Sequence, residues 1–344
     1  MRNENFGASE KVQMGYGFTP GAGRRNASHQ DDPLAELFYN YLEWMPFKEV
    51  DETSDIDDRP WLKSIQKRIY RKVMEIPGMK EKSPEEINSL VVRNASHPDI
   101  AYSGLFLTAC YNAIESPEIV FDIDLEEPIK LVGYGLAKGK TLLIKSNTGC
   151  LTGKKSEGAL VNYAKNAGNT SLGSDSECDI INFGEASDIG SGRNSDVNSR
   201  TINYGIAESI RRDKVFVNFG VADTHGYSVV GINMNHIGTL SGLALTEEVL
   251  INFGTVEDVS DSFNGILLNL GSMQENMNIG WLPIEDAKDK PKLKEYLEGL
   301  RDKLEKYRTA GYPECLEVFE VIDKEVGSIE ELGEKLKGFG CYEE

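Results

Sequence analysis

The sequence predicts an α+β protein in which a central parallel β-solenoid (a β-helix) is flanked by N- and C-terminal helical regions. Three observations predict it. Helical spacing of apolar residues stops near Glu127 and resumes near Ile284, glycine becomes frequent between them, and a short phrase recurs there. We expect a flexible tail over residues 1–32, a helical region over 33–127, the solenoid over 128–282 and a helical region over 283–344.

Helices are expected on both sides of the solenoid. Before it, apolar spacing predicts them over 33–44, 61–74 and 98–114, and Ser83 with Glu86 forms a capping-box pattern that begins another. After it, one helix carries Leu293, Leu297, Leu300 and Leu304 on a single face, and two more are expected over 316–326 and 328–337. Because a solenoid end exposes unpaired strand edges, we expect both helical regions to cap its ends.

The repeated phrase is an aliphatic residue, Asn, an aromatic residue and Gly. It centres on Asn162, Asn182, Asn203, Asn218, Asn233, Asn252 and Asn269, with spacings of 20, 21, 15, 15, 19 and 17 residues. About eight coils follow from this count and from one earlier degenerate copy. Residues such as Ile181 and Phe183 are two apart and share a strand face, which we expect to be the core, with the Asn on the opposite face. The Gly marks a corner where a side chain would crowd the next coil.

The phrase resembles the repeats of mostly archaeal proteins with INFGxAG-like strings. The best matches are 181–186, 202–207 and 217–222, and the resemblance covers about residues 120–282. It implies a β-solenoid and no established activity. The chain is more distantly similar to the glycine-repeat solenoids of glutamate synthases and of a formylmethanofuran dehydrogenase subunit. It lacks the regular glycine spacing of those solenoids, so we carry over no functional residues from them.

The Asn column is the first candidate binding feature. In a parallel solenoid equivalent side chains stack about 4.8 Å apart, so the Asn residues could form an amide ladder. The ladder either supports the coils by hydrogen bonds or presents a flat polar face to a repeating ligand such as a glycan. The candidate binding residues of this column are Asn182, Asn203, Asn218 and Asn252.

A column of carboxylates is the second candidate binding feature. Its members lie five or six residues after an Asn of the repeat and are Asp188, Glu208, Asp223, Glu257, Asp258 and Glu275. Glu208 and Asp223 fall in successive coils and are the candidates for a cation or cationic-partner site. The alternative is a solvated corner that keeps the solenoid from associating laterally.

Charge is unevenly distributed. The early coils carry Lys138, Lys140, Lys145, Lys154, Lys155 and Lys165, whereas residues 215–282 contain acids and no Lys or Arg. This gradient favours head-to-tail association or is an ordinary uneven surface. A basic helix face, with Lys63, Lys67, Arg68, Arg71 and Lys72, is either solvated beside the acidic segment 51–58 or binds an acidic partner.

Catalytic templates fail: the glycine motifs lack a phosphate-binding loop, and no complete nucleophile elbow occurs. The best enzyme hypothesis is a carbohydrate-acting lyase or hydrolase on the solenoid face. It would combine the carboxylates with Arg193, Arg200, Arg211 or Arg212.

Composition narrows the function classes. The net charge of −19 argues against nucleic acid or an anionic membrane as the main partner. Five widely spaced cysteines and no apolar leader favour a reduced, cytoplasmic setting, without a disulfide framework or a metal site. We expect no cofactor and no catalytic residues. The leading hypothesis is a non-enzymatic intracellular scaffold or binding module with a protein partner or self-association, and the alternative is the carbohydrate-acting enzyme.

Overall fold

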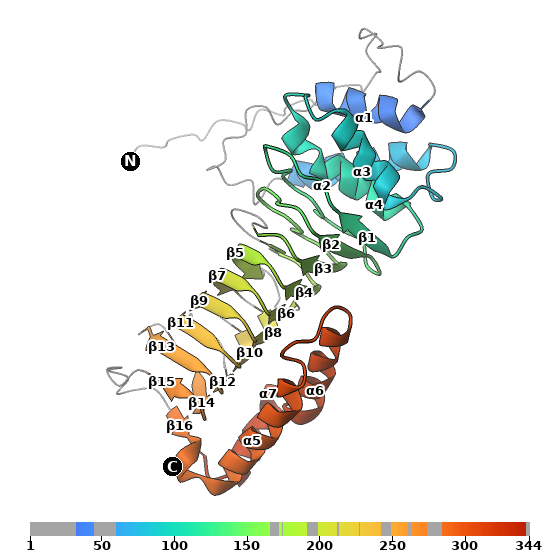
Figure 1. Cartoon of the computed structure of the whole chain (residues 1–344). Coiled ribbons are helices and arrows are strands. Elements are labelled where there is room, and N and C mark those ends of the chain that lie inside the picture. Colours follow the sequence, from blue (N-terminus) through green and yellow to red (C-terminus); the bar gives the residue numbers. More distant parts are fainter. Residues whose placement is uncertain are drawn as a thin grey trace, which may run out of the picture.

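The computed structural model describes residues 32–44, 60–165, 172–173, 175–190, 199–211, 213–226, 228–241, 249–260, 263, 265–273 and 284–341. It confirms the predicted fold class: helices lie at one end of a parallel β-solenoid, and a second group of helices lies beside it (Figure 1). The tail expected over 1–32 lies outside these residues except for Asp32, and so does the acidic segment 51–58.

Two parallel sheets form the solenoid. Sheet A contains β1 (Glu118–Phe121), β2 (Thr141–Ile144), β3 (Ala159–Asn162), β4 (Asp179–Asn182), β6 (Arg200–Asn203), β8 (Asp213–Asn218), β10 (Ser228–Asn233), β12 (Val249–Asn252), β14 (Ile266–Asn269) and β16 (Ile284–Asp286), in that spatial order. Sheet B contains β5 (Glu185–Gly190), β7 (Ile206–Arg211), β9 (Val221–His225), β11 (His236–Leu240), β13 (Thr255–Val259) and β15 (Ser272–Met273).

In the described residues, six coils carry a strand in each sheet, from β4–β5 to β14–β15. Strands β2 and β3 are earlier copies in sheet A only, and isolated bridges such as Thr152↔Leu172 replace their sheet B partners. The expected eight coils are reached only if these two are counted. Sheet A also extends past the predicted range 128–282 at both ends, since β1 begins at Glu118 and β16 ends at Asp286.

The corner glycines are explained by close approach of successive coils. A Cβ built on Gly184, Gly205, Gly220, Gly254 or Gly271 would overlap a carbonyl oxygen of the preceding coil. None of these five glycines has a positive φ, so their requirement is steric and not conformational. The prediction that a side chain would crowd the neighbouring coil is confirmed.

One coil shows what a side chain does at this corner. Asn235 takes the glycine position after Asn233, and the backbone bond from His236 N to Gly220 O is 3.4 Å long there. The equivalent bonds of the other coils, such as Ile206 N to Gly184 O, measure 2.7–2.9 Å. A side chain at the corner therefore widens the gap between coils.

The N-terminal helices cap the solenoid, as predicted. They are α1 (Pro33–Trp44), α2 (Pro60–Met74), α3 (Pro84–Arg93), the 3₁₀ turn η2 (Ile100–Tyr102) and α4 (Gly104–Ala113). The expected helix over 98–114 is thus two elements. The Ser83–Glu86 capping box of α3 is present. Thr108 of α4 accepts a hydrogen bond from Gly133 N at 2.8 Å, and one buried cluster runs from these helices into the solenoid interior.

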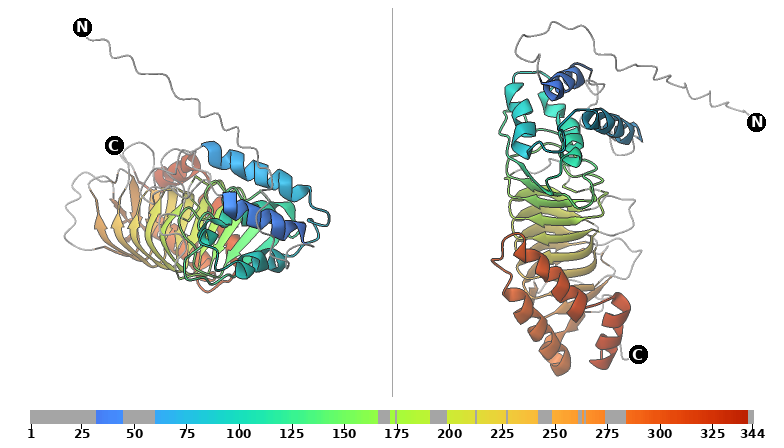
Figure 2. Two further views of the ribbon diagram at one scale, coloured as in Figure 1. Left: turned by 90° about the horizontal axis from the view of Figure 1, so that it is seen from above. Right: turned by 90° about the vertical axis from the view of Figure 1, so that its right-hand side faces the viewer.

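The C-terminal helices are α5 (Pro291–Glu305), α6 (Glu317–Glu325) and α7 (Ile329–Gly338). One 3₁₀ turn, Ala287–Asp289, precedes α5, and another, Glu314–Leu316, precedes α6. They lie along the outer face of sheet A (Figure 2), so the prediction that they cap the solenoid end is wrong. The leucine face of α5 is buried in one cluster with Ile202, Val217 and Ile232 of sheet A.

The two faces of sheet A are the reverse of the prediction: the Asn residues face the interior, and the residues beside them face the C-terminal helices. Ile180 and Asn182 face the interior, whereas Ile181 faces outward beneath the helices; all three are fully buried. Ala186 also faces inward, four residues after Asn182, so no phase change occurs at the glycine. Alternation could not separate the two faces because both are buried.

We predict that Gly205→Ala lowers the free energy of unfolding by at least about 2 kcal/mol, because the new Cβ forces two coils apart. Gly299→Ala is the matched control: its Cβ would meet open space on α5, so it should stabilise the protein by about 0.5–1 kcal/mol. Urea unfolding of both variants tests this, and equal effects would contradict the steric explanation.

Candidate functional site

The predicted Asn ladder is present. Each Nδ2 donates to the Oδ1 of the next Asn along the stack, from Asn162 to Asn269, through six bonds of 2.7–3.0 Å. Each Asn from Asn162 to Asn252 also donates its second amide proton to a backbone carbonyl of the next coil, for example from Asn218 to His236 O at 2.8 Å. Because these side chains are buried, their amides replace hydrogen bonds to water with bonds inside the solenoid.

The candidate binding residues Asn182, Asn203, Asn218 and Asn252 are therefore inaccessible, each with no exposed surface. The hypothesis that they form a ligand-binding polar face is wrong, because the column faces the interior. What the column does is support the coils, which was the alternative interpretation of the ladder.

We predict that Asn203→Ala lowers the free energy of unfolding by about 2–4 kcal/mol, because it leaves Asn182 Nδ2 and Asn218 Oδ1 without their buried partners. Asn235→Ala removes an exposed amide outside the ladder and should change stability by less than about 0.5 kcal/mol. Denaturant unfolding compares the two. A stable Asn203→Ala protein would rule out the supporting role.

An aromatic stack follows the Asn ladder by one residue. Tyr163, Phe183, Tyr204 and Phe219 have successive ring centroids 4.9–5.0 Å apart and ring planes within 10° of parallel. Tyr204 donates its hydroxyl to Tyr307 O at 2.8 Å, which ties the stack to the segment after α5. The sequence contained this signal, the aromatic position of each repeat, but the prediction assigned those rings to the core. They instead form part of the surface on which the C-terminal helices dock.

The outer face of sheet B is the surface that remains exposed. Strand register places Glu208 beside Asp223, as predicted, and both side chains are exposed. Gly238 and then Glu257 continue that row, whereas Asp188 and Asp258 belong to the neighbouring row with Ser209, Thr224 and Thr239. The predicted single carboxylate column is therefore two rows, and Glu275 lies outside the described residues.

We call the outward acids of this sheet the acidic face. Its members are Glu185, Asp188, Glu208, Asp223, Glu257 and Asp258. His236 Nε2 lies 3.7 Å from Glu257 Oε1. No helix of the described part of the chain packs over these strands, in contrast to sheet A (Figures 1 and 2).

The arginines of the predicted lyase site are not gathered at these acids. Arg200 pairs with Asp179 through bonds of 2.7 and 2.8 Å and lies over the Phe319 ring, so it belongs to the sheet A side. The solenoid interior separates it from Glu208 and Asp223. Arg193, Arg212 and the Arg211 side chain lie outside the described residues.

Asp213 and His225 are titratable groups buried within the solenoid. Burial raises the pKa of Asp213 to about 7, although Ser199 Oγ donates to its carboxylate at 2.7 Å. Burial lowers the pKa of His225 to about 3, so its ring, stacked on Phe216 and 3.2 Å from Ser228 Oγ, is neutral. The His225–Ser228 pair has the composition of a nucleophile and base, but substrate cannot reach it because both residues are 3% exposed.

We predict that Asp213→Asn stabilises the protein at pH 8 by about 2–4 kcal/mol and that the gain disappears near pH 4. As pH rises from about 4 to 7, the unfolded chain loses this proton before the folded chain does, so the wild-type free energy of unfolding falls. The neutral amide of the variant does not ionise, so it adds no such pH dependence to the free energy of unfolding. Urea unfolding at both pH values measures it, with the exposed Asp302→Asn as control; a gain that is independent of pH would contradict the assignment.

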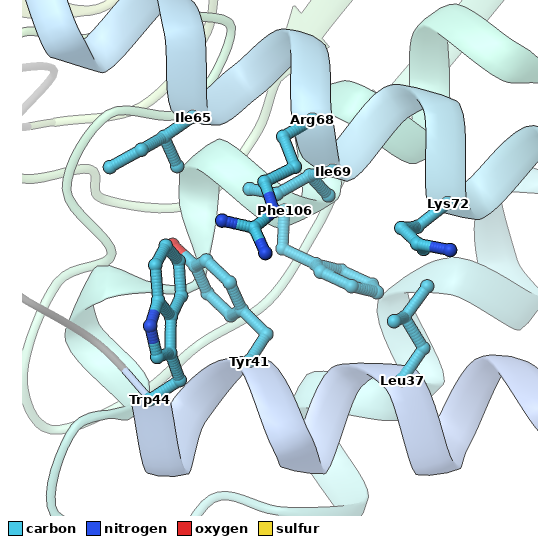
Figure 3. Close-up of a pocket in the computed structure, with 8 residues that line it drawn as sticks. All are labelled: Leu37, Tyr41, Trp44, Ile65, Arg68, Ile69, Lys72 and Phe106. Carbon is cyan, nitrogen blue, oxygen red and sulfur yellow. The ribbon is translucent and has the colours of Figure 1, made fainter. Parts of the chain in front are cut away.

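A small cavity lies between α1 and α2. It measures about 20 Å³, enough for about one water molecule, and its lining is mostly apolar. Tyr41 of α1 and Ile69 of α2 line it from opposite helices, with Phe106 between them (Figure 3). The Arg68 guanidinium lies 5.7 Å from the Trp44 ring and covers one side. We interpret this cavity as a packing seam that joins α1 to α2.

Comparison with known proteins gave no match: no protein-family model, no curated protein and no solved structure is similar to this chain. The resemblance to archaeal INFGxAG-repeat proteins therefore stays a prediction. Within the described residues, no helix has the length and apolar character to cross a membrane, and no cluster of three His, Cys, Asp or Glu side chains could hold a metal ion.

Proposed function

We propose that this protein is a non-enzymatic scaffold or binding module that works inside the cell and binds a protein with a basic surface through the acidic face. The observation that carries the proposal is the difference between the two sheets. The outer face of sheet A is covered by the chain's own helices, whereas the outer face of sheet B is exposed, regular and acidic.

The regularity of the solenoid suits a scaffold. Because each coil is bonded to the next through both sheets and the Asn ladder, the outward rows of sheet B are held at fixed spacing. A preorganised surface loses little conformational entropy when a partner binds. Sheet A supports the proposal that an outer sheet face of this solenoid can bind a partner, since its own outer face already binds three amphipathic helices of the same chain.

A carbohydrate-acting enzyme is less well supported. Such an enzyme needs a cation and several carboxylates around one accessible pocket. Arg200 is engaged by Asp179 on the other sheet, and Asp213 and His225 are buried in the interior. An intracellular setting is supported by the odd number and the wide spacing of the five cysteines.

We predict that Glu208→Gln, Asp223→Asn and Glu257→Gln combined weaken binding of a ten-residue lysine peptide by about threefold to tenfold at low salt, since exposed charge contacts contribute about 0.2–1 kcal/mol each. The matched control neutralises Glu295, Glu314 and Glu320 of the C-terminal region, which gives the same change in net charge. Fluorescence anisotropy measures both. Equal weakening would mean that only total charge matters and would overturn the proposal.

Light scattering at low and high salt tests whether the partner is a second copy of the chain. An oligomer that dissociates at high salt, and that the acidic-face variant does not form, would identify this chain as its own basic partner. A monomer at both salts would leave a different protein as the partner.

A further inference from the structure

A groove of about 310 Å³ lies between α2 and the loops that precede and follow β2. It is separate from the outer faces of both sheets. Its lining comprises Lys63, Gln66, Lys67 and Tyr70 of α2, Asn112 of α4, residues 134–137, and Lys155 with Glu157. We call it the lysine groove. Its volume is in the range of small-molecule sites, which begins near 300 Å³.

The groove is cationic although the protein is strongly acidic. Lys63 and Lys67 are four residues apart and lie on one face of α2, while Lys155 comes from the solenoid side of the groove. Glu157 is the one acid that lines it. In the described part of the chain, none of the three lysines has a carboxylate within ion-pair distance. Among the residues that the structure describes, three lysines thus line one groove without a carboxylate partner.

The walls are preformed by buried polar contacts. Gln66 Nε2 donates to Tyr134 O, and Asn112 donates to Gly135 O at 3.1 Å while its Oδ1 accepts from Ala137 N at 2.9 Å. Gly135 has φ +61°, and a Cβ there would overlap the Gln66 amide. Helices α2 and α4 are therefore bonded to the loop that forms the floor, and the groove does not depend on a ligand for its shape.

We propose that the lysine groove binds a small phosphorylated molecule, with a phosphate group between Lys63, Lys67 and Lys155 and the rest of the ligand against Tyr70. All the cations are lysines, which contact phosphate oxygens as point charges. The Tyr70 ring is 37% exposed and offers an apolar surface on which a planar ring stacks.

The ligand is small because the basic region is local. A long polyanion would extend from the groove over a protein of net charge −19, where repulsion opposes binding. The site is independent of the acidic face, so it stands or fails separately from the proposed function.

Isothermal titration calorimetry with inorganic pyrophosphate and with ADP tests the proposal on the full chain. We expect one saturable site, and we expect Lys67→Gln with Lys155→Gln to weaken binding at least tenfold. The matched control, Arg71→Gln with Lys80→Gln, removes two exposed cations outside the groove and should change affinity by less than about twofold. Circular dichroism confirms that the variants fold.

Two further titrations test which class of ligand the groove binds. Tyr70→Ala should weaken ADP and leave pyrophosphate unchanged, because only ADP carries a ring. Citrate should bind at least tenfold more weakly than pyrophosphate. The proposal is overturned if neither phosphate probe binds, if both double variants weaken binding equally, if citrate binds as tightly as pyrophosphate, or if affinity for single-stranded oligonucleotides increases steadily with length and exceeds that for ADP.

Discussion

The coils depend on one interaction, the ladder of buried Asn amides. An amide can donate to the next coil and accept from the previous one, so the same side chain satisfies both neighbours. An Asp at this place could not donate, and a register shift of one residue would turn every Asn outward. The ladder thus fixes the register in which the corner glycines and the aromatic rings stack.

The same register decides where the C-terminal helices lie. With the Asn facing inward, the residues before it, such as Ile181, Ile202 and Val217, form a continuous apolar row on the outside of sheet A. Exposed apolar rows of this length need a cover, and the leucine face of α5 supplies it. The outward rows of sheet B are mostly polar, with the exposed Ile206 as an exception, and have no such cover in the described residues. One strand register therefore produces one covered face and one exposed face.

The elements with local signals could be predicted from the sequence. The Ser83 capping box, the Leu293–Leu304 face and the Asn spacing depend on neighbours within a turn or a coil. The inward and outward sides of sheet A could not be predicted, because both sides are buried and the Asn was placed on the side opposite the core. The repetition of the Asn at every coil was the available sign that it faces the interior. The sequence indicated Lys63 and Lys67 as part of a basic helix face that could bind an acidic partner. It did not indicate the groove, because Lys155 joins these lysines only in the folded chain.

The two proposed binding surfaces carry opposite charge. The lysine groove lies against the N-terminal helices, and the acidic face belongs to the later coils, so each surface repels the ligand of the other. At physiological ionic strength, charges in solvent are screened over about 8 Å, and a local group of lysines therefore keeps its attraction for a phosphate despite the distant acids. The net charge of −19 opposes binding of an extended polyanion more than binding of a compact one. An acidic solenoid can hold both sites because they are separated along its length.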